Sequence, residues 1–260
     1  MADSRLLGAS SIETFLLAVA MGEVGGHEVL TIPGRSTSAI DNNELQDIAQ
    51  HAPTNGVLAR PGGVGVEIVS SSANDTSTGT GIQTADMAYL DVNLVQQVET
   101  FTMNGLTAVP SVATDIEDVQ WLHGKTIGAI GNQTAAGNIH IRGLTDTPIY
   151  EMIAAGGNQS LTARYRIPAG KTAYILGWHC TATTKPVDFR LRANIDKDTR
   201  EVITPFLFQD ALIIDVGTSP YIPLYNKISG KATVKVSGIS TAAGGPGSAT
   251  FFLLLVDNDA

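Results

Sequence analysis

Cysteine is nearly absent from this sequence, since Cys180 is the single one among 260 residues. An intrachain disulfide is therefore impossible, and a metal site that uses several thiolates is excluded. Cys180 ends the mostly apolar segment Ala173–Cys180. A free cysteine in such a segment typically behaves as a small buried hydrophobe, so we expect it in the core.

Basic residues are also scarce: 16 Lys and Arg stand against 25 Asp and Glu, and the formal net charge is −9. A nucleic-acid binder needs a basic face, because the release of counterions from phosphates supplies most of its affinity. The Lys and Arg residues form no such cluster along the chain. The composition therefore argues against DNA or RNA as a partner.

Long apolar runs are missing too. The longest are Phe15–Met21 and Phe251–Val256, far shorter than the roughly 18 apolar residues that cross a bilayer, so we expect no membrane partner. A secretory signal needs a basic start and a cleaner apolar stretch, so we do not expect export either. Ser10 followed by Glu13 instead fits a capping box that opens a short helix.

Motifs of known catalytic sites do not occur. The sequence contains neither HExxH nor G-x-S-x-G. Gly124–Thr126 and Gly170–Thr172 resemble the end of a phosphate loop, but Val119 and Tyr165 stand where that motif needs a further glycine, so both are interpreted as turns. No two histidines pair at metal-ligand spacing on one helix face; the five are His27, His51, His123, His140 and His179. We therefore predict a protein that is not an enzyme, with no catalytic, cofactor-binding or metal-binding residue and no cofactor.

Three carboxylates could contradict the prediction that the protein is not an enzyme. Asp86 and Asp91 lie in and just after one predicted strand, and Glu99 lies on the next. A glycosidase uses such a pair as acid and nucleophile. Clefts that degrade sugars also need stacking rings, and aromatic residues make up only 6% of this chain. We expect all three carboxylates to be solvated residues near strand ends.

Two further features have an ordinary interpretation. The oxygens of Asn74–Ser77 could bind Ca²⁺, but the spacing does not match an EF-hand loop, so a polar turn is expected. Trp121 and Trp178 are interpreted as anchors of a core or an interface rather than as platforms for sugars.

The remaining pattern is that of a mainly β protein. A hydrophobic fraction of 43% is enough for a core, and from Val57 onward short runs of Val, Ile, Thr and aromatic residues alternate with clusters of Gly, Asn, Asp and Ser. The predicted strands are Val64–Ser70, Ile82–Leu90, Gln97–Met103, Gly137–Arg142, Ser160–Ile167, Thr172–Cys180, Val187–Ala193, Leu212–Val216, Lys231–Ser237 and Ala249–Val256.

The side-chain period within these runs indicates how the strands are covered. Phe189–Ala193 and Ala232–Val236 alternate, which predicts one face on a core and one in water. Phe251–Val256 does not alternate, which predicts a strand that is covered on both sides or lies at an interface. Asn104-Gly105 predicts a tight hairpin turn, and Pro168–Gly170 predicts a β-turn between two strands.

The beginning of the chain has a different texture. Residues 1–55 contain two short helix-like stretches, Ile12–Met21 and Asn43–His51, joined by the Gly/Pro/Ser/Thr-rich connection Gly22–Ile40. Isolated helices of this length are marginal in water. We therefore expect an N-terminal arm that is ordered by packing on its own body or on a neighbour.

The rest divides at its weakest stretch, Asp146–Gln159, which contains a proline and a Gly-Gly pair. Two antiparallel β-sandwich modules are expected, over residues 56–146 and 160–260. The pattern leaves open whether they are jelly rolls or immunoglobulin-like.

One part of the chain is more specific than its composition. Val69–Gly81, with the sequence VSSSANDTSTGTG, runs into Ile82–Tyr89 and is followed by Gln97–Thr100, Asn104-Gly105 and Gly137–Ile141. Residues 64–143 thereby resemble a β domain common in structural proteins of tailed bacteriophages, including those of cyanobacteria. The segment Tyr165–Thr172 resembles, more weakly, the opening of a second β module in similar proteins.

The resemblance implies a virion protein without catalytic residues, assembled in the host cytoplasm. We expect a capsid cement or decoration protein, a homotrimer that binds the outer face of the major capsid protein lattice, and a charge of −9 suits an outward-facing position better than a DNA-facing one. The alternatives are a tail-associated or fibre-adaptor protein with a host-binding role, a phage-encoded glycan hydrolase, and the major capsid protein itself. The last lacks support, because no stretch supplies the long spine helix of tailed-phage shells.

Overall fold

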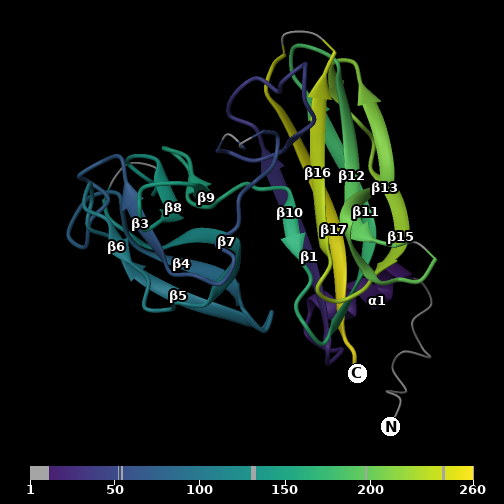
Figure 1. Cartoon of the computed structure of the whole chain (residues 1–260), viewed down its shortest axis with the longest axis horizontal. Helices are drawn as coiled ribbons and strands as arrows, with labels where there is room; N and C mark the ends of the chain where they lie inside the picture. Colours follow the sequence, from purple (N-terminus) through teal and green to yellow (C-terminus); the bar gives the residue numbers. More distant parts are fainter. Residues whose placement is uncertain are drawn as a thin grey trace.

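The computed structural model describes residues 12–51, 53, 55–129, 133–196, 198–241 and 244–259 (Figure 1). The protein is mainly β, with 53% strand and 4% helix, in several antiparallel sheets, as the sequence predicts. The sheets have a propeller-like arrangement, and the expected pair of sandwiches is not confirmed. The capping residue Ser10 lies outside the described residues.

Two lobes stand side by side in Figure 1. The first lobe contains β3 (Val66–Ser70), β4 (Ile82–Asp91), β5 (Gln96–Thr102), β6 (Val109–Pro110), β7 (Ile116–Ile127), β8 (Ile139–Gly143) and β9 (Ile149–Ile153). The second lobe contains α1 (Ile12–Ala20), β1 (His27–Arg35), β2 (Gln46–Asp47), β10 (Arg164–Arg166), β11 (Lys171–Ala182), β12 (Val187–Ile195), β13 (Val202–Ile214), β14 (Gly217–Thr218), β15 (Ile222–Ile228), β16 (Thr233–Ser240) and β17 (Gly247–Asp257).

The first lobe is built from two sheets around one core. Sheet C has the strand order β6-β3-β8-β9, and sheet D has the order β5-β4-β7. Alternate residues of their strands, among them Ile68, Met87, Leu122 and Ile141, are fully buried together. The two-residue period of a strand puts these side chains on one face, and burying that face holds the two sheets together.

The second lobe has a larger core between two further sheets. Sheet A has the order β1-β17-β11-β14, with β15 also paired to β11, and sheet B has the order β10-β16-β12-β13, with β2 paired to β16. Trp178, Phe189 and Phe251 are the largest fully buried side chains. The sequence shows no alternation in Phe251–Val256, but the burial of these residues does alternate: one face of β17 lies in the core and the other is half-buried. Strands β1 and β11 pair with its two edges.

The expectation for Ala232–Val236 was wrong. All five residues are buried, including Thr233 and Lys235, which the alternation had placed in water. The short strand β2, from more than 180 positions earlier, pairs with β16 and brings Asp47 to Lys235. The polar face of β16 is therefore covered by the chain itself. By contrast, Phe189–Ala193 has the predicted alternation.

The N-terminal part is a component of the second lobe. The predicted helix Ile12–Met21 is confirmed as α1, but the predicted helix Asn43–His51 is wrong, because Gln46 and Asp47 form strand β2. The connection Gly22–Ile40 contains β1, which pairs with β17 along its whole length. The reason is a tertiary one: both strands gain their partners from the far end of the chain, which no local pattern reveals.

Other local predictions had mixed outcomes. The turn Pro168–Gly170 is confirmed, with the Lys171 N–H donating to the carbonyl of Pro168 at 3.4 Å. Asn104-Gly105 is not a hairpin turn, because in the described part of the chain β5 pairs with β4, the strand before it, and not with the strand that follows Gly105. Gly105 nevertheless has the expected positive φ of 60°. The stretch Asp146–Gln159 contains strand β9, and β7, β15 and most of β13 were missed.

Candidate functional site

The turn Asn74–Ser77 is organised by one buried carboxylate. Asp75 Oδ1 accepts hydrogen bonds from the N–H groups of Ile82 at 2.8 Å and Ala136 at 2.9 Å. Its Oδ2 accepts from the Ser70 hydroxyl at 2.6 Å and the Gly137 N–H at 2.9 Å. Four donors occupy this carboxylate, so it ties the turn to the loop before β8 and has a structural role. Within the VSSSANDTSTGTG motif, the network accounts for Ser70 and Asp75.

The three weighed carboxylates do not form a pair. In the β4–β5 ladder, Asp86 lies opposite Thr100, and Glu99 lies opposite Met87, the residue after Asp86. The side chains of Asp86 and Glu99 therefore point to opposite faces of sheet D. Asp86 accepts a hydrogen bond from the Thr100 hydroxyl at 2.6 Å. Glu99 accepts two from backbone N–H groups between β6 and β7, and Asp91 accepts two from its own turn. Each therefore stabilises local structure.

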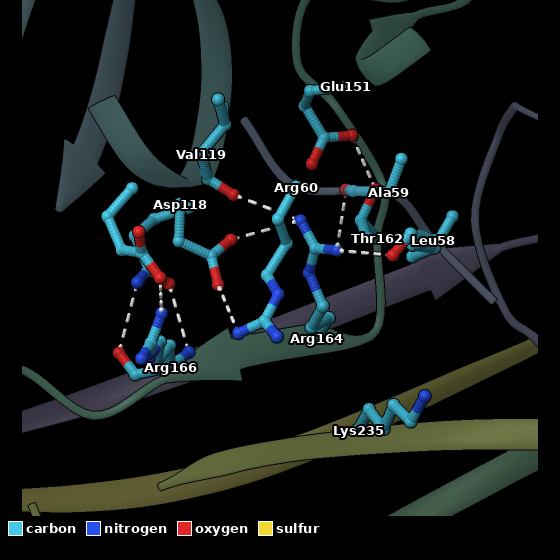
Figure 2. A network of polar contacts seen from close by, with 12 residues as sticks. Leu58, Ala59, Arg60, Asp118, Val119, Glu151, Thr162, Arg164, Arg166 and Lys235 are labelled. Carbon is cyan, nitrogen blue, oxygen red and sulfur yellow. Dashed lines mark hydrogen bonds and ion pairs between the residues drawn. The ribbon is translucent and has the colours of Figure 1, made fainter. Parts of the chain in front are cut away.

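A buried polar junction connects the two lobes (Figure 2). Arg164, on β10, forms an ion pair with Asp118, on β7, with Nη2 and Oδ1 3.2 Å apart. The guanidinium also donates to the backbone carbonyls of Leu58, Ala59 and Val119 at 3.4, 3.2 and 3.3 Å. Arg164 and Asp118 are both buried, so one buried charged pair links β10 of the second lobe to β7 of the first.

Neighbouring residues extend this junction. The amide of Gln120 bonds both the N–H and the carbonyl of Arg166, at 3.1 and 3.0 Å, as a peptide group in a ladder would. Arg166 also forms an ion pair with Glu117 at 2.8 Å, and Arg60 approaches Asp118 at 3.8 Å. Burial nevertheless raises the pKa of Asp118, although the Arg164 guanidinium opposes this shift.

Glu151, on β9, is a buried acid beside this junction. One carboxylate oxygen accepts hydrogen bonds from the Thr162 hydroxyl and from the N–H of Met152, the latter at 3.1 Å. The other oxygen, Oε2, has no partner among the described residues. Burial raises the pKa of Glu151 to about 7, against the lowering effects of Thr162 and Arg164.

The acid at this position makes stability depend on pH. The pKa of Glu151 is about 7 in the folded protein and 4.5 in the unfolded chain. Between these pH values the folded state keeps a proton on Glu151 that the unfolded state has released. The contribution of Glu151 to stability is therefore complete below about pH 4.5 and is lost as the pH rises through about 7. We expect Glu151→Gln to remove this loss, which amounts to roughly 3 kcal/mol. Urea unfolding of both proteins at about pH 5 and pH 8 measures the difference.

His51 changes stability with pH in the opposite direction to Glu151, and it does so equally in the wild type and in Glu151→Gln. It is buried, neither ring nitrogen has a partner among the described residues, and burial lowers its pKa to about 3. Its contribution is present above about pH 6.5 and is lost as the pH falls toward 3. Parallel pH curves for the wild type and Glu151→Gln would contradict the role assigned to Glu151.

A second buried polar cluster lies on the outer face of sheet B. Asp47 forms ion pairs with Lys235 at 2.9 Å and with Arg192 at 3.3 Å, and it accepts a hydrogen bond from Ser237 at 2.7 Å. The ring of Phe206 covers Lys235, with Nζ 4.2 Å from the ring centre. This cluster fastens β2 to sheet B.

Of the other side chains considered in the sequence, Cys180 and Trp178 lie in the second core and Trp121 does not. Cys180 is buried, as predicted, and burial raises the pKa of its thiol. Trp178 is fully buried and donates to Asp210 at 2.9 Å, whereas Trp121 is half-buried at the side of β7 that faces the second lobe.

Within the described ranges, no group of three or more His, Cys, Asp or Glu side chains is placed to hold a metal ion. No helix in the part of the chain that the structure describes is long and apolar enough to cross a membrane.

The most prominent surface feature is an exposed apolar edge. Strand β13 is the last strand of sheet B and β15 the last of one side of sheet A, and both lie at the right of Figure 1. Large exposed apolar side chains gather on these strands and the segment between them: Val202, Leu207, Phe208, Ile213, Val216, Tyr221 and Tyr225. We call this surface the β13–β15 edge. Among the described residues β13, which has 13 residues, pairs with β12 on one side only. Its other edge, with these exposed apolar side chains beside it, is a ready site for another chain.

Comparison with protein families and with curated proteins adds no relative. No protein-family model matches the chain, and no curated protein matches it. The functional argument therefore depends on the residues and their geometry.

Proposed function

We propose that this protein is a structural component of a tailed-phage virion, a capsid cement or decoration protein that binds the outer face of the major capsid protein lattice. The observation that carries the proposal is the β13–β15 edge. Ile213 is 68% exposed and Phe208 49% exposed on an edge strand, and a subunit that assembles needs such a surface. The resemblance of residues 64–143 to phage structural proteins supports the same class.

The charge and the architecture support the proposal further. A net charge of −9 keeps free subunits apart before assembly and suits the outside of a shell rather than its DNA-facing side. We interpret the two sheets that share the second core as a β-sandwich, which offers free edges to a partner. A homotrimer at three-fold positions is the proposed arrangement.

Copy number tests the location. Quantitative mass spectrometry of purified virions, against the major capsid protein, should find hundreds of copies. A dozen copies or fewer would favour the second candidate, a tail-associated or fibre-adaptor protein. Shells that lack the protein should also lose resistance to heat and osmotic shock, and unchanged shells would exclude a cement role.

The edge itself can be tested with charged substitutions. We expect the double variant Phe208→Lys/Ile213→Lys to lose at least tenfold in binding to capsid shells, because lysines on an edge strand oppose pairing with another strand. Co-sedimentation with shells that lack the protein measures this.

The matched control is Val112→Lys, since Val112 is 90% exposed on the other lobe. It should bind as the wild type does, and both variants should keep the wild-type melting temperature. Undiminished binding of the double variant would move the contact away from this edge.

A further inference from the structure

A cavity of about 440 Å³ lies between the two lobes, a size typical of small-molecule sites. Residues of strand β7 of the first lobe, of β1 of the second lobe and of the connection before β10 line it. The residues that line this interlobe groove are Thr31, Ile32, Pro33, Gln120, Trp121, Leu122, His123, Gln159, Ser160 and Thr162. None of them is Asp, Glu, Lys or Arg, so the groove suits an uncharged ligand.

Two rings form one wall of the groove. Leu122 points into the first core, so its neighbours Trp121 and His123 point out of the opposite face of sheet D. Their ring centres are 4.7 Å apart and their planes are inclined by 39°. They form a continuous aromatic surface opposite Ile32 and Pro33 of β1.

The polar groups of the groove fall into two sets. The side chains of Gln120, Ser160 and Thr162 are engaged: Gln120 bonds the Arg166 backbone, Ser160 accepts from the Leu122 N–H at 3.0 Å, and Thr162 donates to Glu151.

The second set is free for a ligand. The indole N–H of Trp121, the ring nitrogens of His123, the amide of Gln159 and the hydroxyl of Thr31 make no hydrogen bond to the residues that the structure describes. The groove thus combines an aromatic wall with free donors and acceptors in its lining.

We propose that this interlobe groove binds a neutral pyranose sugar unit. One face of a pyranose ring presents C–H groups, which pack on an aromatic surface, while its hydroxyls project around the edge and need amide, hydroxyl and imidazole partners. The arrangement of Trp121 and His123 with Gln159 and Thr31 supplies both. This inference goes beyond the proposed structural role and does not depend on it.

Free sugars provide the probes. Saturation-transfer NMR with the methyl glycosides of glucose, galactose, mannose and N-acetylglucosamine should show transfer to at least one of them. The same sugar should change the fluorescence of Trp121, because Trp178, the other of the two tryptophans, is fully buried. We expect Trp121→Ala to weaken binding tenfold or more and Gln159→Ala to weaken it less.

Tyr225→Ala is the matched control, since it removes an exposed aromatic ring that lies on the β13–β15 edge. It should bind the sugar as the wild type does. Circular dichroism should show that the two groove variants remain folded. If Trp121→Ala unfolds, the weaker sugar binding expected for Gln159→Ala tests the proposal instead. No saturation transfer to any of the four sugars, or transfer that survives both groove variants, would overturn the proposal.

Discussion

Replacing Arg164 by methionine is expected to lower the free energy of unfolding by about 3–5 kcal/mol, because it leaves a buried charge without its partner. Arg164 and Asp118 are both buried, and their side chains are 3.2 Å apart. Methionine keeps much of the side-chain volume but has no donors. Asp118 would lose its buried ion pair and keep only the longer contact with the half-exposed Arg60. The carbonyls of Leu58, Ala59 and Val119 would lose a hydrogen-bond donor.

Equilibrium urea unfolding, followed by circular dichroism, measures this loss. Arg60→Met is the matched control, because Arg60 contacts the same carboxylate at 3.8 Å but its side chain is 45% exposed, and we expect a loss under about 1 kcal/mol. Adding Asp118→Asn to Arg164→Met should restore part of the stability, since it removes the unpaired charge. A loss for Arg164→Met no larger than for Arg60→Met would show that the junction does not hold the lobes together.

The second large effect is expected for Asp47→Ala, again about 3–5 kcal/mol. Asp47 is the carboxylate partner of Lys235 and Arg192 in the cluster on sheet B. Burial already lowers the pKa of Lys235, and Asp47 is what opposes that shift. Without Asp47, the lysine must lose its proton or remain charged and buried, and β2 would lose its main attachment to β16.

The control for this variant is Asp188→Ala on the same sheet. Asp188 pairs with Arg190 at 2.7 Å in a partly exposed position, so we expect a loss under about 1 kcal/mol. Lys235→Met combined with Asp47→Asn should recover stability relative to Asp47→Ala, because an apolar replacement of a buried ion pair is often tolerated. If the urea concentration at the midpoint of unfolding is the same for Asp47→Ala as for the wild type, the cluster does not stabilise the fold.

The strands were predictable where a local pattern specifies them. The runs at Ile82–Leu90, Val187–Ala193 and Ala249–Val256 are bounded by turn-forming residues, and each is a strand within a residue or two of its expected ends. The burial of Cys180 followed in the same way from its apolar neighbours. Side-chain period and β-propensity are properties of a few consecutive residues, which the sequence displays directly.

The polar clusters were not predictable by the same means. Glu151 stands between apolar residues in Ile149–Ile153, which is a signal of a buried acid, but its partners Thr162 and Arg164 come from another segment. Lys235 alternates with apolar residues as a solvated lysine would. Only the pairing of β2 with β16 shows that it is buried.

The sequence by itself determined the mainly β class, the sites of many strands, the buried cysteine and the acidic charge, because each follows from composition or from neighbours in the chain. The tertiary structure alone decided that β1 and β2 belong to the second lobe, that Arg164 and Asp118 meet between the lobes, and that Trp121 faces a groove. These features depend on contacts between residues far apart in the chain. Such contacts are fixed when sheets bury their apolar faces together, and a local pattern cannot specify which distant segment supplies the partner.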